Sequence, residues 1–260
     1  MSTIEFSFGE PGDAPINGIN IGGVGSGLVD VREATDGKVT GRIECSDGSY
    51  LERAEVRQSH DQLRIQLPNN VGRGPAVYIE LTVPPNLAFQ IGTGSADVNI
   101  QTSIVQSKIS TGSGDIGLSH GDDVRCTAGS GDLNVGTLVG SNSQLNTGSG
   151  EITVNQANAS LSARAASGDV TVHRFAGLMR ASTASGDINI GSTTGSLELR
   201  TASGDVTVGV ADDLPAWLDL RSVSGEVHID LDATGQPAEG EPYVTITAST
   251  ASGDVSIHRA

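Results

Sequence analysis

The sequence predicts an all-β protein: a parallel β-solenoid (β-helix) of about nine coils with a 17–19-residue repeat, preceded by a small antiparallel β region. Three observations lead to this fold class. A short motif recurs nine times after residue 88, apolar and polar residues alternate on both sides of it, and the composition suits a thin core. Glycine supplies 35 of the 260 residues and aromatic residues only 3%, so small and aliphatic side chains must fill the interior.

The repeated motif is Gly or Ala, then Ser, Gly and an acidic residue, followed by a β-branched residue or Leu. All nine copies have an acidic residue and a serine two positions before it. The acidic positions are Asp97, Asp115, Asp132, Glu151, Asp169, Asp187, Asp205, Glu226 and Asp254. The serines are Ser95, Ser113, Ser130, Ser149, Ser167, Ser185, Ser203, Ser224 and Ser252.

Each unit is predicted to form two short strands around a corner. An apolar residue follows each acidic position directly and another follows three positions after it. Alternation with a period of two is typical of β-strands, and its phase changes at the glycine, which tolerates the positive φ that corners often need. One unit cannot bury its own apolar face, whereas units stacked about 4.8 Å apart can.

Residues 1–88 lack this period but contain alternating segments at 3–8, 28–33, 39–45, 63–67 and 77–83. We therefore expect two domains, with residues 1–88 as an N-terminal β region and residues 89–260 as the solenoid repeats. The N-terminal region would cap the first coil, because an unpaired strand edge recruits other strands.

The charge balance disfavours some partners. Lys and Arg number 15 against 31 Asp and Glu, a net charge of −16, so we expect no nucleic-acid partner and no membrane insertion. The chain opens without a basic segment or a long apolar run, and the expected localisation is cytoplasmic. Cys45 and Cys126 lie far apart, with neither a disulfide framework nor a CxxC spacing, and are expected to be small apolar residues.

The acidic positions form a predicted ladder of carboxylates about 5 Å apart, which repel by roughly 1 kcal/mol in water. Hydrogen bonds from turn amides can offset this repulsion, and so can a bound cation such as Ca²⁺. The motif has one acidic residue per unit and differs from the calcium-binding nonapeptide GGxGxDxUx. The prediction is a structural turn ladder made of these acidic residues and the nine serines, without metal or cofactor, and cation binding stays as the alternative.

The sequence predicts no catalytic residues. A nucleophilic serine needs a base within reach, and none of the five histidines recurs beside the same serine. The loop clusters His120–Asp123 and Asp212–Asp213 are interpreted as polar loops; paired carboxylates in such loops could otherwise serve a lyase. The run GGVGSG at 22–27 lacks the Lys-Ser/Thr ending of a phosphate loop.

Several segments together resemble a known family. They are LRIQLP, VYIELTVPPNLAFQIGTGSADVNI and the units TGSGDI, TASGDI and TASGDV. From about residue 28 to 260 the chain resembles the DUF4097 family, the "putative adhesin" β-strand-repeat proteins. The resemblance implies a β-solenoid-like fold and no known catalytic activity.

The end of the chain suggests an interaction. The last repeat stops at Ala260 with no predicted cap, so Val255, Ile257, His258 and Arg259 are the expected self-association end. The chain would pair there with another copy, as a dimer or filament, or with an unidentified protein; alternatively, the insertion at 232–242 folds over the end as a lid. We predict a non-enzymatic β-solenoid scaffold, with an adhesin-like surface protein and a polysaccharide-lyase-type enzyme as alternatives.

Overall fold

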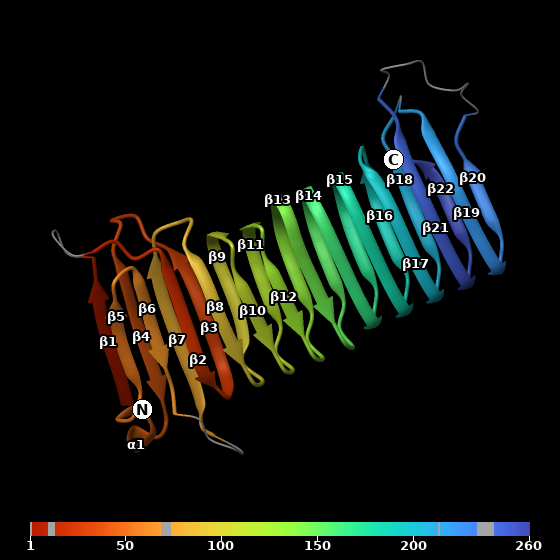
Figure 1. The fold of residues 1–260 in the computed structure, drawn as a ribbon. Helices are drawn as coiled ribbons and strands as arrows, with labels where there is room; N and C mark the ends of the chain where they lie inside the picture. Colours follow the sequence, from red (N-terminus) through yellow and green to blue (C-terminus); the bar gives the residue numbers. More distant parts are fainter. Residues whose placement is uncertain (1, 10–13, 69–73, 213, 233–241) are drawn as a thin grey trace. The chain divides into compact units, whose positions relative to one another are not determined.

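The structure, a computed structural model, describes residues 2–9, 14–68, 74–212, 214–232 and 242–260 (Figure 1). Strands form almost all of its regular structure, beside one four-residue helix. The chain divides into two compact units, residues 1–134 and 135–260. The all-β, solenoid-like fold is confirmed, whereas the domain boundary at residue 88 stays a prediction.

The first unit contains two columns of parallel strands. One column is formed in order by β6 (Gln62–Gln66), β2 (Gly18–Val24), β8 (Ala88–Thr93), β10 (Lys108–Thr111) and β12 (Arg125–Ala128). The other is formed by β7 (Ala76–Val83), β3 (Ser26–Glu33), β9 (Asp97–Val105) and β11 (Ile116–Asp122). A coil is one strand from each column, joined at a corner.

Equivalent positions of successive coils stack in register and are buried. Ile21 pairs with Ile91, Ile91 with Ile109, and Ile109 with Cys126. All four side chains are buried. The core is thus a narrow column of aliphatic side chains, as the low aromatic content predicted.

The order of coils in this unit differs from their order in the sequence. The β2–β3 coil lies between β8–β9 and β6–β7. Antiparallel pairing is confined to β5 (Glu55–Ser59) on β6, β4 (Val39–Cys45) on β7, and β1 (Ser2–Phe8) on β4. Within residues 1–88 the antiparallel strands therefore lie beside parallel strands that already belong to the coils.

The run GGVGSG is the corner of the β2–β3 coil. The amides of Gly94 and Ser95 donate to the carbonyls of Val24 and Gly25, at 2.8 and 2.6 Å. Leu28 then pairs with Asp97 and takes the place of the acidic residue. Because the β2–β3 coil lacks the acidic residue of the motif, the sequence pattern did not identify it as a repeat.

The second unit repeats the two-column arrangement. Its strands are β13 (Leu133–Thr147), β14 (Ile152–Ser167), β15 (Val170–Ser185), β16 (Ile188–Thr193), β17 (Ser196–Ser203), β18 (Val206–Val210), β19 (Ala216–Ser224), β20 (Val227–Asp230), β21 (Val244–Ser252) and β22 (Val255–Arg259). The first halves of β14 and β15 continue into β16, β18, β22 and β20, and their second halves into β17, β21 and β19.

The last coil in sequence is not the last coil in space. Strand β22 pairs with β18 on one side and β20 on the other, so Ile257 lies between Val208 and Ile229. Val255 and His258 are likewise paired on both sides, and Arg259 pairs with Val210. The expectation that these residues form an open edge is wrong, because β22 lies between β18 and β20, and β21 lies between β17 and β19. Self-association itself stays a prediction.

Candidate functional site

The acidic ladder is joined by hydrogen bonds between adjacent coils. In each bond, Oδ1 of an aspartate accepts the backbone N–H of the acidic residue in the next coil. The donor–acceptor pairs are Asp115–Asp97 and Asp132–Asp115 at 2.9 Å, and Asp187–Asp169, Asp205–Asp187, Asp254–Asp205 and Glu226–Asp254 at 2.8 Å. A charge-assisted bond of this kind offsets repulsion between neighbouring carboxylates without a cation.

The serine of the motif lies at the surface. The buried hydroxyl that bonds to the adjacent coil belongs to a threonine two residues earlier. All nine ladder serines are exposed. Thr183, Thr201 and Thr250 instead donate to the carbonyls of Gly168, Gly186 and Gly204, at 3.0–3.1 Å. This second ladder was not predicted from the sequence, although Thr or Ser stands four residues before most of the acidic positions.

The glycine of the motif is required by a close approach of adjacent coils. Gly186 has a φ of +158°, and a Cβ there would collide with the carbonyl oxygen of Gly168. Only glycine fits such a position without a shift of the backbone. The threonine, glycine and aspartate positions of the Thr-x-Ser-Gly-Asp corner therefore have structural roles.

The described residues offer little for catalysis or metal binding. No group of three or more His, Cys, Asp and Glu gathers among them. Among the described residues, His60 contacts Ser59 and His228 contacts Glu226, and neither contact involves a ladder serine. Cys45 and Cys126 are buried and free, and burial raises the pKa of Cys126 to about 12, which keeps its thiol protonated. Asp213 of the second loop cluster lies outside the described residues.

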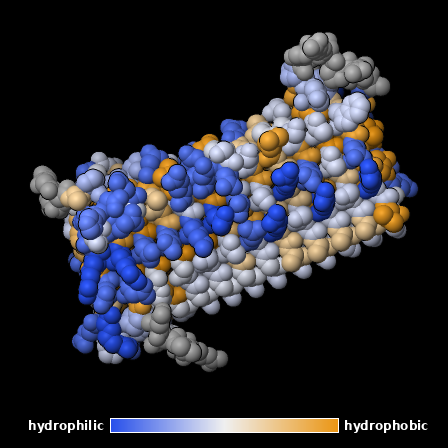
Figure 2. Space-filling model, in the orientation of Figure 1, coloured by the Kyte–Doolittle hydropathy of each residue, from blue (hydrophilic) through white to orange (hydrophobic). Residues whose placement is uncertain are grey.

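The β19–β20 coil forms an edge of the second unit. In the described part of the chain, β19 pairs only with β21 and β20 only with β22. Val227 and Ile229 are 41% and 54% exposed, although Val255 and Ile257, their register partners, are 0% and 1% exposed. Trp217 and Val223 are also exposed, and Figure 2 shows hydrophobic residues at the surface where Figure 1 labels β19 and β20. We call this strand pair the β19–β20 edge. The predicted lid at 232–242 lies almost wholly outside the described residues.

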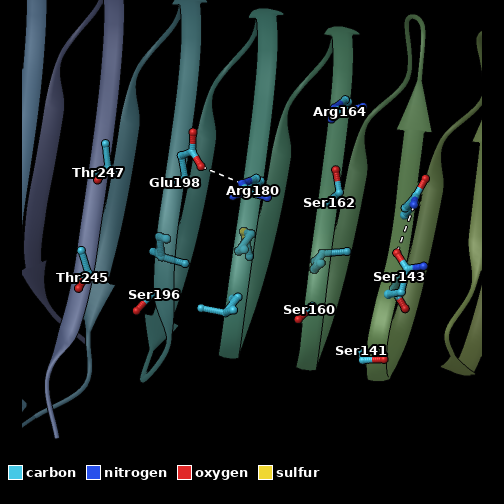
Figure 3. Close-up of a pocket in the computed structure, with 16 residues that line it drawn as sticks. Ser141, Ser143, Ser160, Ser162, Arg164, Arg180, Ser196, Glu198, Thr245 and Thr247 are labelled. Carbon is cyan, nitrogen blue, oxygen red and sulfur yellow. Dashed lines mark hydrogen bonds and ion pairs between the residues drawn. The ribbon is translucent and has the colours of Figure 1, made fainter.

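A groove of about 780 Å³ crosses the second unit (Figure 3). It runs over residues 141–144 of β13 and over β14, β15, β17 and β21. Most of its lining is polar: Ser, Thr, Asn and Gln side chains, with Arg164, Arg180 and Glu198. Leu178 is its exposed apolar residue. Sequence reasoning missed this site, because its residues follow no motif and come together only through the strand register.

Glu198 is held in the groove by two arginines. Its carboxylate contacts Arg180 at 2.8 Å and Arg200 at 2.7 Å. The hydrogen bond from Arg180 lowers the pKa of Glu198, so this carboxylate stays ionised and paired. Among the described residues Arg164 has no such partner, and its guanidinium is available to a ligand.

No helix in the described ranges is long and apolar enough to cross a membrane.

No curated protein matches the chain. Solved structures do match: the "putative adhesin" of Bacteroides fragilis at 14% identity and a TM-score of 0.46, over 98% of this chain and 97% of that one. The "putative lipid binding protein" of Parabacteroides distasonis matches at 15% identity and a TM-score of 0.48, over 98% and 96%. These values are too low to transfer either name to this chain.

The family model for Toastrack DUF4097 matches residues 24–258. The match spans both compact units and every copy of the corner motif. It begins at residue 24, the end of β2 and the start of the corner of the β2–β3 coil. The chain belongs to the Toastrack DUF4097 family.

Proposed function

We propose that this protein is a non-enzymatic interaction scaffold that pairs with a second copy of itself through the β19–β20 edge. One observation carries the proposal: β19 and β20 leave one strand side unpaired in the described chain while presenting Val227 and Ile229 to solvent. Unpaired, apolar edges are templates for further strands, and soluble proteins normally blunt them with charge, proline or a covering element.

The mass of the full-length protein over a range of concentrations tests the proposal. We expect light scattering to report dimers or larger assemblies whose share rises with concentration, and negative-stain images to show end-joined particles. Ile229→Lys and Val227→Lys should return the protein to the monomer, because each places a charge in the new interface. A wild-type protein that is monomeric at every concentration contradicts self-association.

A matched control separates the edge from general charge effects. Ala184→Lys adds the same charge at an exposed position of β15, away from the edge, and should leave the assembly unchanged.

Replacing residues 233–241 by a short linker tests the predicted lid. Stronger association after the replacement would mean that the insertion limits access to the edge, whereas unchanged association would argue against a lid.

The alternatives make different predictions. A polysaccharide-lyase-type enzyme needs carboxylates and a basic residue converging in a cleft, but the groove holds one carboxylate, Glu198, already paired with two arginines. Asp122 and Asp123 belong to the other compact unit.

An adhesin-like role predicts the protein in membrane or surface fractions. We propose instead that the scaffold is cytoplasmic, which predicts the protein in the soluble fraction of lysed cells.

A further inference from the structure

The groove on the second unit presents ordered rows of side chains. In one row Ser160, Leu178 and Ser196 are register neighbours on β14, β15 and β17. In the next row Ser162, Arg180, Glu198 and Thr247 follow one another on β14, β15, β17 and β21. Neighbouring strands are about 4.8 Å apart, so these four strands span about 14 Å. The rows fit an extended ligand of a few repeating units lying across the strands.

The face is positively charged although the chain carries a net charge of −16. On the second halves of β14 and β15 and on β17 and β19, the outward charged residues are Arg164, Arg180, Arg200 and Arg221, against Glu198 and Asp219. Both carboxylates are paired with arginines on the same face. The surplus guanidinium charge, on Arg164 above all, would attract an anionic ligand.

The polar lining of the groove further restricts the chemical class of the ligand. The strands under the groove already form their ladder hydrogen bonds, so a peptide cannot add there as another strand. Recognition must come from hydroxyls, amides and guanidinium groups, which match a ligand rich in hydroxyls and carboxylates. Trp217, the only tryptophan in the chain, lies beside Thr245 on the next strand and exposes a ring on which a sugar can stack.

We propose that the groove binds a short acidic oligosaccharide, whose carboxylates contact Arg164 and Arg180 and whose hydroxyls contact the serine and threonine side chains. The contacts come from side chains of four adjacent strands, so the ligand lies across them. This binding goes beyond the scaffold function, because it uses the outward face of the coils and leaves the unpaired strand side free.

Isothermal titration of the full-length protein with tetragalacturonate tests this proposal. We expect saturable binding and a change in Trp217 fluorescence. Arg164→Gln should weaken binding about tenfold and Arg180→Gln by about tenfold or more, since each removes a charge-assisted hydrogen bond. The loss should be larger for Arg180→Gln, because it also leaves Glu198 with one arginine fewer. Arg174→Gln is the matched control: Arg174 lies on β15 outside the groove and bonds to Gln156.

Each outcome decides the question once thermal unfolding shows that the variants are folded. The absence of saturable binding, equal affinity for an uncharged galactotetraose, or an equal loss in Arg174→Gln would overturn the proposal. Arg164-dependent binding of phosphatidylglycerol vesicles or of oligodeoxythymidylate, without binding of tetragalacturonate, would overturn it in favour of that ligand class. Ile229→Lys should bind tetragalacturonate as the wild type does, so this test and the self-association test fail separately. Recovery of intact tetragalacturonate is expected, and shorter products would contradict the non-enzymatic scaffold.

Discussion

The β6–β7 edge of the first unit and the β19–β20 edge of the second unit are built from the same alternating pattern but are finished differently. At the first edge, β5 pairs with β6, β4 pairs with β7, and β1 pairs with β4. The short helix α1 (Gly48–Leu51) follows β4 and buries Tyr50 and Leu51. At the second edge, the described residues supply no such cover, and Ile229 is 54% exposed.

The difference shows what buries an apolar side chain in this fold. Ile65 on β6 and Ile229 on β20 both stand in alternating strands at an edge coil. Among the described residues, a further strand lies beside Ile65 and none lies beside Ile229. Antiparallel strands are one of the usual means of closing a sheet edge. The first unit therefore has a finished edge, and the second has the edge at which we place a partner.

The largest effect is expected from a pair of equivalent isoleucines. Ile257→Lys places a charge in the core between Val208 and Ile229, and should cost about 4 kcal/mol or more of unfolding free energy. Ile229→Lys changes the same motif position at the edge and should cost less than about 1 kcal/mol, since the ammonium stays in water. Denaturant unfolding of both variants measures the difference, and equal losses would contradict the coil order.

The sequence predicted the repeat but not the order in which its copies stack. Residues 89–211 follow a nearly constant period, and within each unit their coils stack in sequence order. The last two copies are separated by insertions, and a chain long enough to cross a coil can place its next strand on either side of it. The local pattern around Ile257 and Ile229 is the same, so alternation alone cannot say which of them is at the edge.

The groove was beyond sequence reasoning for a related reason. Outward positions such as Ser160 and Arg180 resemble any solvent-facing residue until the register places them side by side. In contrast, the sequence predicted where the corner motif lies in each coil, and it predicted the structural role of some of its residues. Its acidic and glycine positions have structural roles, but its serines are exposed and the buried hydroxyl belongs to threonine.

A second pair of substitutions compares the interior of the acidic ladder with its edge. Asp187 accepts the amide of Asp205, so Asp187→Ala leaves that N–H without its partner. We expect a loss of about 1–2 kcal/mol in unfolding free energy. Glu226 closes the ladder at the β19–β20 edge through its backbone N–H, which alanine keeps. Among the described residues its carboxylate contacts only exposed His228, so Glu226→Ala should have almost no effect. Full rescue by Asp187→Asn, which keeps an acceptor oxygen, would show that the hydrogen bond matters more than the charge.

Cys126 supplies a test of how dry the core of the coils is. Burial raises the pKa of its thiol from 9.0 to about 12. Above pH 9 the unfolded chain releases this proton and the folded chain keeps it, so the unfolding free energy should fall by about 1.4 kcal/mol per pH unit between pH 9 and 12. The stability difference between wild type and Cys126→Ala should therefore shrink by about 1 kcal/mol from pH 9 to 10, because the unfolded thiol is already half ionised at pH 9. An unchanged difference would mean that water reaches the thiol.

The smallest effect is expected at the finished edge. Tyr50 lies in helix α1, whose N-cap residue is Asp47. Its hydroxyl lies 2.9 Å from the carbonyl oxygen of Pro68 and 3.3 Å from that of Gly23. Tyr50→Phe keeps the packing of the ring but removes this donor, and should lower the unfolding free energy by about 1 kcal/mol. Tyr243→Phe, at an exposed position beside the unfinished edge, is the control and should change little. If both variants unfold like the wild type while amide exchange in β4 accelerates only in Tyr50→Phe, the hydroxyl secures the covering strands without stabilising the coils beneath them. The cover would then open locally, and the contrast between the two edges would be one of degree.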